Sequence, residues 1–218
     1  MGAPRFVDLS HVVADGLVTY PGLPAPSVGE HVSREASRGR YAEGTTFHIG
    51  KIEMIANTGT YLDAPFHRFA GAPDLADLAL ETLADLPGVV VEAPAGARAI
   101  DRLPDGELRG RAVLYRTGWS RHFATPAYAD GHPFLTAAVG DALAARGAAL
   151  VGIDSLNIDD TADGTRPVHT ALLRAGIPIV EHLTNLAALP RDGFRFFAVP
   201  VKVRGMGTFP VRAFAVLP

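Results

Sequence analysis

The sequence contains no cysteine, a single tryptophan and no long apolar run. Without cysteine the chain has no disulfide, no thiolate nucleophile and no sulfur ligand, so a metal ion would have to be held by nitrogen and oxygen atoms. A membrane-spanning helix needs about 20 consecutive apolar residues, which no segment provides, and the first ten residues lack the apolar core of a signal peptide. We therefore expect no membrane attachment and a cytoplasmic location.

The chain also lacks an excess of basic residues, because 20 lysines and arginines stand against 23 acidic residues and the formal net charge is −3. A nucleic-acid partner is therefore not expected, and a small-molecule substrate is. The 218 residues, 48% of them hydrophobic, are enough to bury a substantial core. We predict a single domain that spans residues 1–218.

Short apolar runs with strand character alternate with fewer helical stretches, which predicts a strand-rich α/β fold. The expected strands are residues 5–9, 45–56, 88–93, 112–117, 148–154, 177–181, 194–203 and 211–217. Helices are expected at Thr136–Arg146, where Thr136 can cap the start, at Leu75–Ala84, and from His169 to Gly176.

The strand expected at residues 45–56 changes its pattern near Gly50, where the apolar positions switch from odd to even numbers. A glycine bulge would produce this switch and would turn the loop that follows into a pocket. A strand buried on both faces would produce it equally well.

A polar stretch, N-T-G-T-Y-L-D-A-P-F-H from Asn57 to His67, follows that strand. Gly59 permits a positive φ and Pro65 holds the preceding residue extended, so we expect a stiff loop. A carboxylate and an imidazole four residues apart, Asp63 and His67, are typical of a metal or proton-transfer site. On the residues alone, a segment in which these polar groups only stabilise a turn is an equally good interpretation.

The stretch resembles the signature H-x-G-T-H-x-D-x-P-x-H of the bacterial-type kynurenine formamidase and putative cyclase family. Further matches occur in the same order along the chain: D-L-S-H near residue 8, Y-P-G from Tyr20, R-T-G-W from Arg116, G-H-P-F-L from Gly131, G-I-D-S from Gly152 and H-T-A-L-L-R-A-G-I-P-I-V-E from His169. The resemblance implies a swivelling β/β/α fold and a homodimer or higher homo-oligomer. It also implies metal-dependent hydrolysis of amides such as N-formylkynurenine in tryptophan catabolism, with zinc or manganese as the metal.

Carried over residue by residue, the resemblance covers Asp63, His67, His169 and Glu181, whereas Asn57 and Tyr61 replace two histidine ligands of the signature. A carboxamide and a phenol are poorer donors than neutral imidazoles for zinc, so one metal position is expected to be lost. Asp63, His169 and Glu181 with water can still hold one divalent ion. The same three residues can instead form a metal-free hydrogen-bonded network.

Three functions remain open at this point. The first is a hydrolase of a small cyclic or aryl amide or lactone, arylformamidase-like, in which one metal-activated water acts and His67 transfers the proton. The second is a metal-independent cyclase or lyase of secondary metabolism, in which Asp63 orients His67 as a base and Tyr61 donates to an oxyanion. The third is a homologue that binds a small molecule without catalysis.

Substrate contacts are assigned to Asn57, Phe66 and Trp119. The two aromatic side chains could wall a pocket for an aromatic substrate, and a place in the hydrophobic core is the alternative for each.

Overall fold

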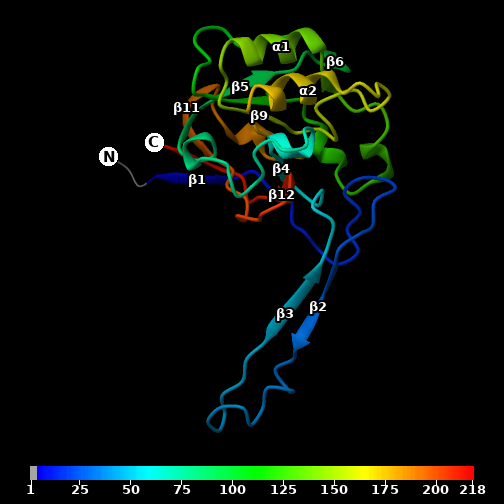
Figure 1. Ribbon diagram of the computed structural model, residues 1–218, viewed down its shortest axis with the longest axis vertical. Helices are drawn as coiled ribbons and strands as arrows, with labels where there is room; N and C mark the ends of the chain where they lie inside the picture. The colour runs from blue at the N-terminus through cyan, green and yellow to red at the C-terminus, as the bar shows by residue number, and fades with distance from the viewer. Residues whose placement is uncertain (1–3) are drawn as a thin grey trace.

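A computed structural model describes residues 4–218, and its centre is a mixed sheet of nine strands in the order β1-β13-β11-β5-β7-β9-β10-β4-β12 (Figure 1). The strands are β1 (Arg5–Asp8), β4 (Tyr61–Asp63), β5 (Leu86–Glu92), β7 (Ala112–Arg116), β9 (Leu150–Ile153), β10 (Ile179–Glu181), β11 (Asp192–Phe197), β12 (Thr208–Pro210) and β13 (Phe214–Leu217). A short parallel pair, β6 (Ala99–Ile100) and β8 (Phe134–Leu135), lies outside this sheet. The strand-rich α/β fold expected from the sequence is confirmed.

The four central strands β5, β7, β9 and β10 run parallel, and they are buried on both faces. Alternate residues of β7 enter two separate core clusters, Leu114 on one face and Val113 on the other. This burial explains why the central strands read as nearly continuous apolar runs. The strands expected at residues 88–93, 112–117, 148–154 and 177–181 are all present, with ends that differ by a few residues.

Two helices, α1 (Ala137–Ala145) and α2 (Pro167–Arg174), pack against each other and cover one face of the sheet (Figure 1). Thr136 caps α1 as expected, because its side chain accepts a hydrogen bond from the amide of Val139. Helix α2 begins two residues before His169, at Pro167, whose fixed φ suits the first helical position. Within residues 4–218 no helix has both the length and the apolar character to cross a membrane.

The helix expected at Leu75–Ala84 is wrong. The segment forms turns and a short 3-10 helix, η2 (Leu80–Thr82). The Asp74 carboxylate accepts hydrogen bonds from the amides of Ala76 and Gly205, which ties the start of the segment to a distant loop. Side-chain bonds of this kind compete with helix formation, so they override the helical pattern of the segment. Four further 3-10 turns are η1 (Pro65–His67), η3 (Trp119–His122), η4 (Pro126–Tyr128) and η5 (Leu186–Ala188).

A long hairpin made of β2 (Ser27–Val32) and β3 (Ile49–Glu53) extends away from the rest of the molecule (Figure 1). All five residues of β3 are exposed, so the interpretation as a strand buried on both faces is wrong. The register of the hairpin shifts between Glu30 and Val32, opposite Gly50 and Ile49, so the extra residue is His31 of β2 and the bulge expected at Gly50 lies on the partner strand. We call this hairpin the arm.

Gly88 gives a test of how tightly the sheet packs. A Cβ atom at Gly88 would overlap the aromatic ring of Phe194, a fully buried residue of the adjacent strand. We expect Gly88→Ala to lower the free energy of unfolding by about 1–3 kcal/mol, the usual cost of overpacking a core. Chemical denaturation followed by circular dichroism measures this change.

Gly164→Ala is the matched control, because a Cβ atom there would meet no atom within 4 Å and the glycine does not have a positive φ. Equal stability of the two variants would contradict the packing described for Gly88.

Candidate metal and catalytic site

The pairing of β4 with its two neighbours builds the floor of the site. The stretch expected to be a loop contains this strand, and its register places Tyr61 opposite Glu181 of β10 and Asp63 opposite Thr208 of β12. Side chains two residues apart point to the same face of a strand, and residues directly opposite each other share that face. Four polar side chains from three distant segments of the chain are thereby brought to one face of the sheet.

The first turn of α2 supplies His169 and holds its orientation. Asp159 accepts hydrogen bonds from the amides of Val168 and His169 and lies 2.7 Å from Nδ1 of the His169 ring. Because an ionised carboxylate only accepts hydrogen bonds, Nδ1 carries a proton, so Nε2 is the ring nitrogen that can offer a lone pair to a ligand once it is deprotonated. A histidine that binds a metal usually donates its other ring N–H to a carboxylate in this way, which fixes the orientation of the ring.

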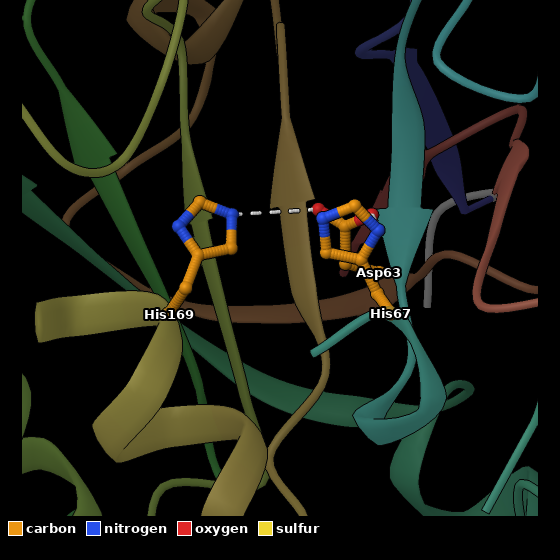
Figure 2. A group of neighbouring side chains, drawn as sticks. All are labelled: Asp63, His67 and His169. Atoms are coloured by element: carbon orange, nitrogen blue, oxygen red, sulfur yellow. Dashed lines mark ion pairs between the residues drawn. The ribbon is translucent and has the colours of Figure 1, made fainter. Parts of the chain in front are cut away.

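Nε2 of His169 points toward two buried carboxylates. It lies 3.6 Å from Oδ2 of Asp63 and 3.6 Å from Oε1 of Glu181, and Figure 2 shows the first of these pairs. Both separations are too long for hydrogen bonds. They are close to the roughly 3.4 Å between donors that share a tetrahedral ion with bonds of about 2.1 Å. This donor set of one imidazole nitrogen and two carboxylate oxygens is therefore compatible with a divalent ion.

His67 joins the same group, because ligand atoms of Asp63, His67 and His169 all lie within 4.8 Å of one another (Figure 2). It is the last residue of η1, which begins at Pro65, the residue expected to hold Ala64 extended. Ala64 is extended, with φ −91° and ψ 163°. Gly59 has the expected positive φ of 65°.

Thr208 fixes the tautomer of His67. Its hydroxyl donates to Oδ1 of Asp63 and lies 2.9 Å from Nδ1 of His67. A hydroxyl has one proton to donate, and the carboxylate takes it, so His67 must donate from Nδ1 to the threonine oxygen. In the neutral imidazole Nε2 of His67 is then the nitrogen without a proton, which is the form that a general base requires.

The charges of the site determine which groups carry protons. Burial disfavours a charged His169, but its interactions with Asp159 and Asp63 and the charge of Glu181 outweigh burial and raise the pKa of His169 to about 10. Burial, together with the nearby charge of Asp63, raises the pKa of Glu181 to about 7. Burial alone would raise the pKa of Asp63, but the neighbouring His169 and His67 hold it below its usual value. Without a metal ion, a protonated His169 is therefore the main counter-charge of these buried acids.

Tyr61 and Asn57 occupy the two positions where the signature has histidines. The hydroxyl of Tyr61 donates to Oε2 of Glu181 at 2.7 Å, and the Asn57 amide is a further hydrogen-bond neighbour of that hydroxyl. Burial and the charges of Glu181 and Asp63 raise the pKa of Tyr61 well above its usual value, so the phenol stays protonated. Tyr61 is thus a neutral donor that holds one oxygen of Glu181.

A cavity of about 340 Å³ opens onto these groups. Its lining residues are Tyr20, Leu23, Asn57, Tyr61, Asp63, His67, Arg68, Asn157, Arg166, His169 and Glu181. Of the residues assigned to the site from the sequence, this cavity brings together all except Phe66 and Trp119. Trp119 lines a different pocket and donates its indole N–H to the carbonyl of Tyr128, while Phe66 is 36% exposed outside the cavity.

The sequence predicted no site role for Thr208, which lies in no motif, or for Tyr20, Asn157 and Arg166, which line the cavity. The adjacent acids Asp159 and Asp160 follow a predicted strand and are interpreted from the sequence as a cation-binding pair or as part of a solvated loop. Asp159 instead lies buried against the ring of His169. The motif residue Asp154 has a supporting role, because it accepts hydrogen bonds from the amides of Thr117 and Gly118. Two of the matched motifs therefore hold each other in place.

Comparison with known proteins places this geometry in context. The model of the family described as Putative cyclase matches residues 7–160. A kynurenine formamidase from Bacillus cytotoxicus is 27% identical over 214 residues, which are 98% of each chain. A solved structure described as a potential metal-dependent hydrolase with cyclase activity has a TM-score of 0.78 at 23% identity and covers 99% of each chain. An isatin hydrolase bound to thioisatinate has a TM-score of 0.78 at 19% identity, over 99% of this chain and 93% of that one.

Metal binding should release a proton from His169. Its raised pKa stabilises the metal-free fold below pH 6.5, and this stability is lost as the pH rises through about 10. At pH 8 the histidine is therefore still protonated, whereas an ion needs the lone pair of Nε2. We expect titration of the metal-free protein with Zn²⁺ at pH 8 to release about one proton per site. Calorimetry in two buffers of different ionisation enthalpy measures that number.

The control is Asp159→Asn, which removes the carboxylate behind His169 and should reduce the number of protons released. Zinc binding without proton release in the unsubstituted protein would show that His169 is neutral and that the charge assignment is incorrect.

Proposed function

The chain belongs to the Putative cyclase family, and from that premise we propose that it is a hydrolase of a small aryl or cyclic amide or lactone, arylformamidase-like in its chemistry. The observation that carries the proposal is the convergence of Asp63, His169 and Glu181 beside His67 in one cavity. The names of the relatives, kynurenine formamidase and isatin hydrolase, support the same class of reaction.

Asp63, His169 and Glu181 would hold one divalent ion, zinc or manganese. An ion in such a site polarises a carbonyl group and lowers the pKa of a bound water. Tyr61 and the amide of Ile158 each donate to Glu181, and Asp159 holds His169, so the three donors are oriented before any ion binds.

His67 transfers the proton in this scheme. As water forms a new C–O bond to the amide carbonyl carbon, Nε2 of His67 accepts a proton from that water. The C–N bond then breaks, and the imidazolium gives the proton to the leaving nitrogen, so His67 returns to its starting state. The hydrogen bond from Nδ1 to Thr208 keeps the ring in place throughout. For an aryl formamide the products are formate and the free arylamine.

The metal-independent cyclase or lyase with Tyr61 as the oxyanion donor is the second candidate. It is less favoured, because the hydroxyl of Tyr61 already donates to Glu181 at 2.7 Å and is fully buried. A hydrogen bond to a substrate oxyanion would have to replace that contact and leave a carboxylate oxygen unsatisfied. A role in tryptophan catabolism accompanies the formamidase proposal and one in secondary metabolism accompanies the cyclase. Both roles, like the cytoplasmic location, stay predictions.

Hydrolysis of N-formylkynurenine and metal content test the proposed function together. We expect about one divalent ion per chain by elemental analysis of the purified protein, and hydrolysis that a chelator abolishes and added Zn²⁺ or Mn²⁺ restores. Protein without a stoichiometric metal and without chelator-sensitive activity would contradict the metal-dependent hydrolase.

Two variants separate the remaining alternatives. His67→Ala should lower kcat about 10²- to 10⁴-fold, the usual contribution of a general base. Tyr61→Phe should have a smaller effect than His67→Ala, whereas the cyclase alternative requires a loss at least as large. Tight binding of a small molecule with no turnover would instead favour the non-catalytic homologue.

We also propose that the protein is a homodimer joined through the arm. Val28 and Ile52 lie directly opposite each other on the two strands and are 48% and 50% exposed. An isolated two-stranded hairpin is only marginally stable in water. The rest of the chain does not cover the arm (Figure 1). A second copy related by two-fold symmetry would cover both arms at once.

The molar mass of the protein, measured by light scattering after size-exclusion chromatography, tests this proposal. We expect twice the 23.0 kDa chain mass for the unsubstituted protein and the single-chain mass for Val28→Lys combined with Ile52→Glu. Lys51→Gln, on the same strand but on the opposite face, is the control and should remain dimeric. A monomeric unsubstituted protein would overturn the proposal.

A further inference from the structure

Arg166 is an arginine in the wall of the cavity without an acidic partner. Its guanidinium donates only weakly to neutral oxygens, at 3.4 Å to the Asn157 side chain and 3.3 Å to the carbonyl of Asp160. Among residues 4–218 no carboxylate lies within ion-pair distance of it. Two acids are close to Arg166 in the chain. The carboxylate of Asp160 is paired with Arg98 at 2.9 Å, and that of Asp163 accepts hydrogen bonds from the amide and the hydroxyl of Thr165. The charge of Arg166 is therefore available to a ligand.

The backbone of Arg166 holds it in this position at a cost. Its φ of 50° and ψ of 60° are left-handed values that non-glycine residues rarely adopt. The residue before a proline is disfavoured in the right-handed helical region, and Pro167 begins α2 directly afterwards. Uncommon backbone conformations persist where the surrounding structure enforces them, and they cluster at ligand-binding sites.

Arg68 lies on the same cavity from the other side, directly after His67. Its Nε donates to the hydroxyl of Thr170 on α2 at 3.2 Å, which leaves its terminal nitrogens free. Both arginines are more exposed than the acids of the site, since Asp63 and Glu181 are each 1% exposed. The cavity thus has an acidic floor and a basic rim.

Other donor groups near Arg166 already have partners. The backbone amides of Val168 and His169 at the start of α2 donate to Asp159. His169 faces the acidic floor rather than the rim. Tyr20, whose phenol neighbours Arg166, adds a neutral hydrogen-bonding group next to the guanidinium.

We infer that Arg166, assisted by Arg68, binds a carboxylate of the substrate at the rim of the cavity, so that the enzyme selects amides or lactones that carry an anionic group. The planar fork of a guanidinium matches a carboxylate and can bind it through two parallel hydrogen bonds. With the carboxylate held by Arg166, the remainder of a small substrate can reach His67, which lines the same cavity. This inference rests on the proposed function for its catalytic meaning, while the anion site itself can be tested without turnover.

Binding of benzoate and of its neutral isostere benzamide tests the site directly. By isothermal titration calorimetry we expect Arg166→Gln to raise the Kd for benzoate about tenfold or more, with a smaller change for benzamide. Arg166→Lys, which keeps the charge without the fork, should recover part of the loss. Arg191→Gln removes an arginine that is paired with Asp105 away from the cavity and should bind benzoate as the unsubstituted protein does.

Benzoate could also bind to a metal ion, so each titration is repeated with chelator present. Benzoate binding that the chelator abolishes and Arg166→Gln leaves intact would overturn the inference. Equal loss in Arg166→Gln and Arg191→Gln would overturn it too, because the effect would then come from net charge alone.

Turnover of a matched substrate pair separates this inference from the proposed function. We expect 2-formamidobenzoate to be hydrolysed with a higher kcat/KM than neutral formanilide, and Arg166→Gln to reduce the ratio of the two values about tenfold or more. Hydrolysis of both with no preference would overturn the carboxylate site and leave the hydrolase standing. Hydrolysis of neither would count against the hydrolase, and the benzoate titration would still decide the site.

Discussion

The antiparallel pairing of β4 between β10 and β12 is the constraint on which the site depends. It places Tyr61 opposite Glu181 and Asp63 opposite Thr208, so that one strand of three residues aligns groups from three distant parts of the chain. A shift of one residue in this register would turn every one of these side chains to the opposite face of the sheet. The parallel core beside it, buried on both faces, makes such a shift costly.

The electrostatics of the site follow from that geometry. Asp63, Asp159 and Glu181 are buried within reach of one imidazole, His169, and buried acids need compensating charge. A proton on His169 provides this charge in the metal-free protein, and a divalent ion that takes the place of the proton would provide it more fully. Asp63 and Glu181 therefore suit either a protonated His169 or a divalent ion. Hydrogen bonds from Tyr61 and Ile158 hold Glu181 in place, and one from Thr208 holds Asp63.

Asn57 and Tyr61 stand where the signature has histidines, and they take other roles in the site. Tyr61 supports Glu181 through a hydrogen bond and stays protonated, and Asn57 lies beside it at the cavity wall. The result is a site with fewer imidazole donors and a firmly held carboxylate. A cavity whose floor is acidic and whose rim carries Arg68 and Arg166 can orient a small substrate that has different groups at its two ends.

The sequence by itself determined the strand-rich α/β class, the central strands and a candidate site that contains Asp63 and His67. It could do so because apolar periodicity and the spacing of a signature are local properties. Leu75–Ala84 shows the limit of this reasoning, since hydrogen bonds from Asp74 to a distant loop override a helical pattern. Only the tertiary structure decided that Asp159 orients His169, that Thr208 sets the tautomer of His67, and that Trp119 and Phe66 lie outside the cavity. The contact between Thr208 and His67 joins residues 141 positions apart and depends on strand register, which no local pattern encodes. Asp159 and His169 are only ten positions apart, but their contact depends on how the loop before α2 folds back on the first turn of the helix.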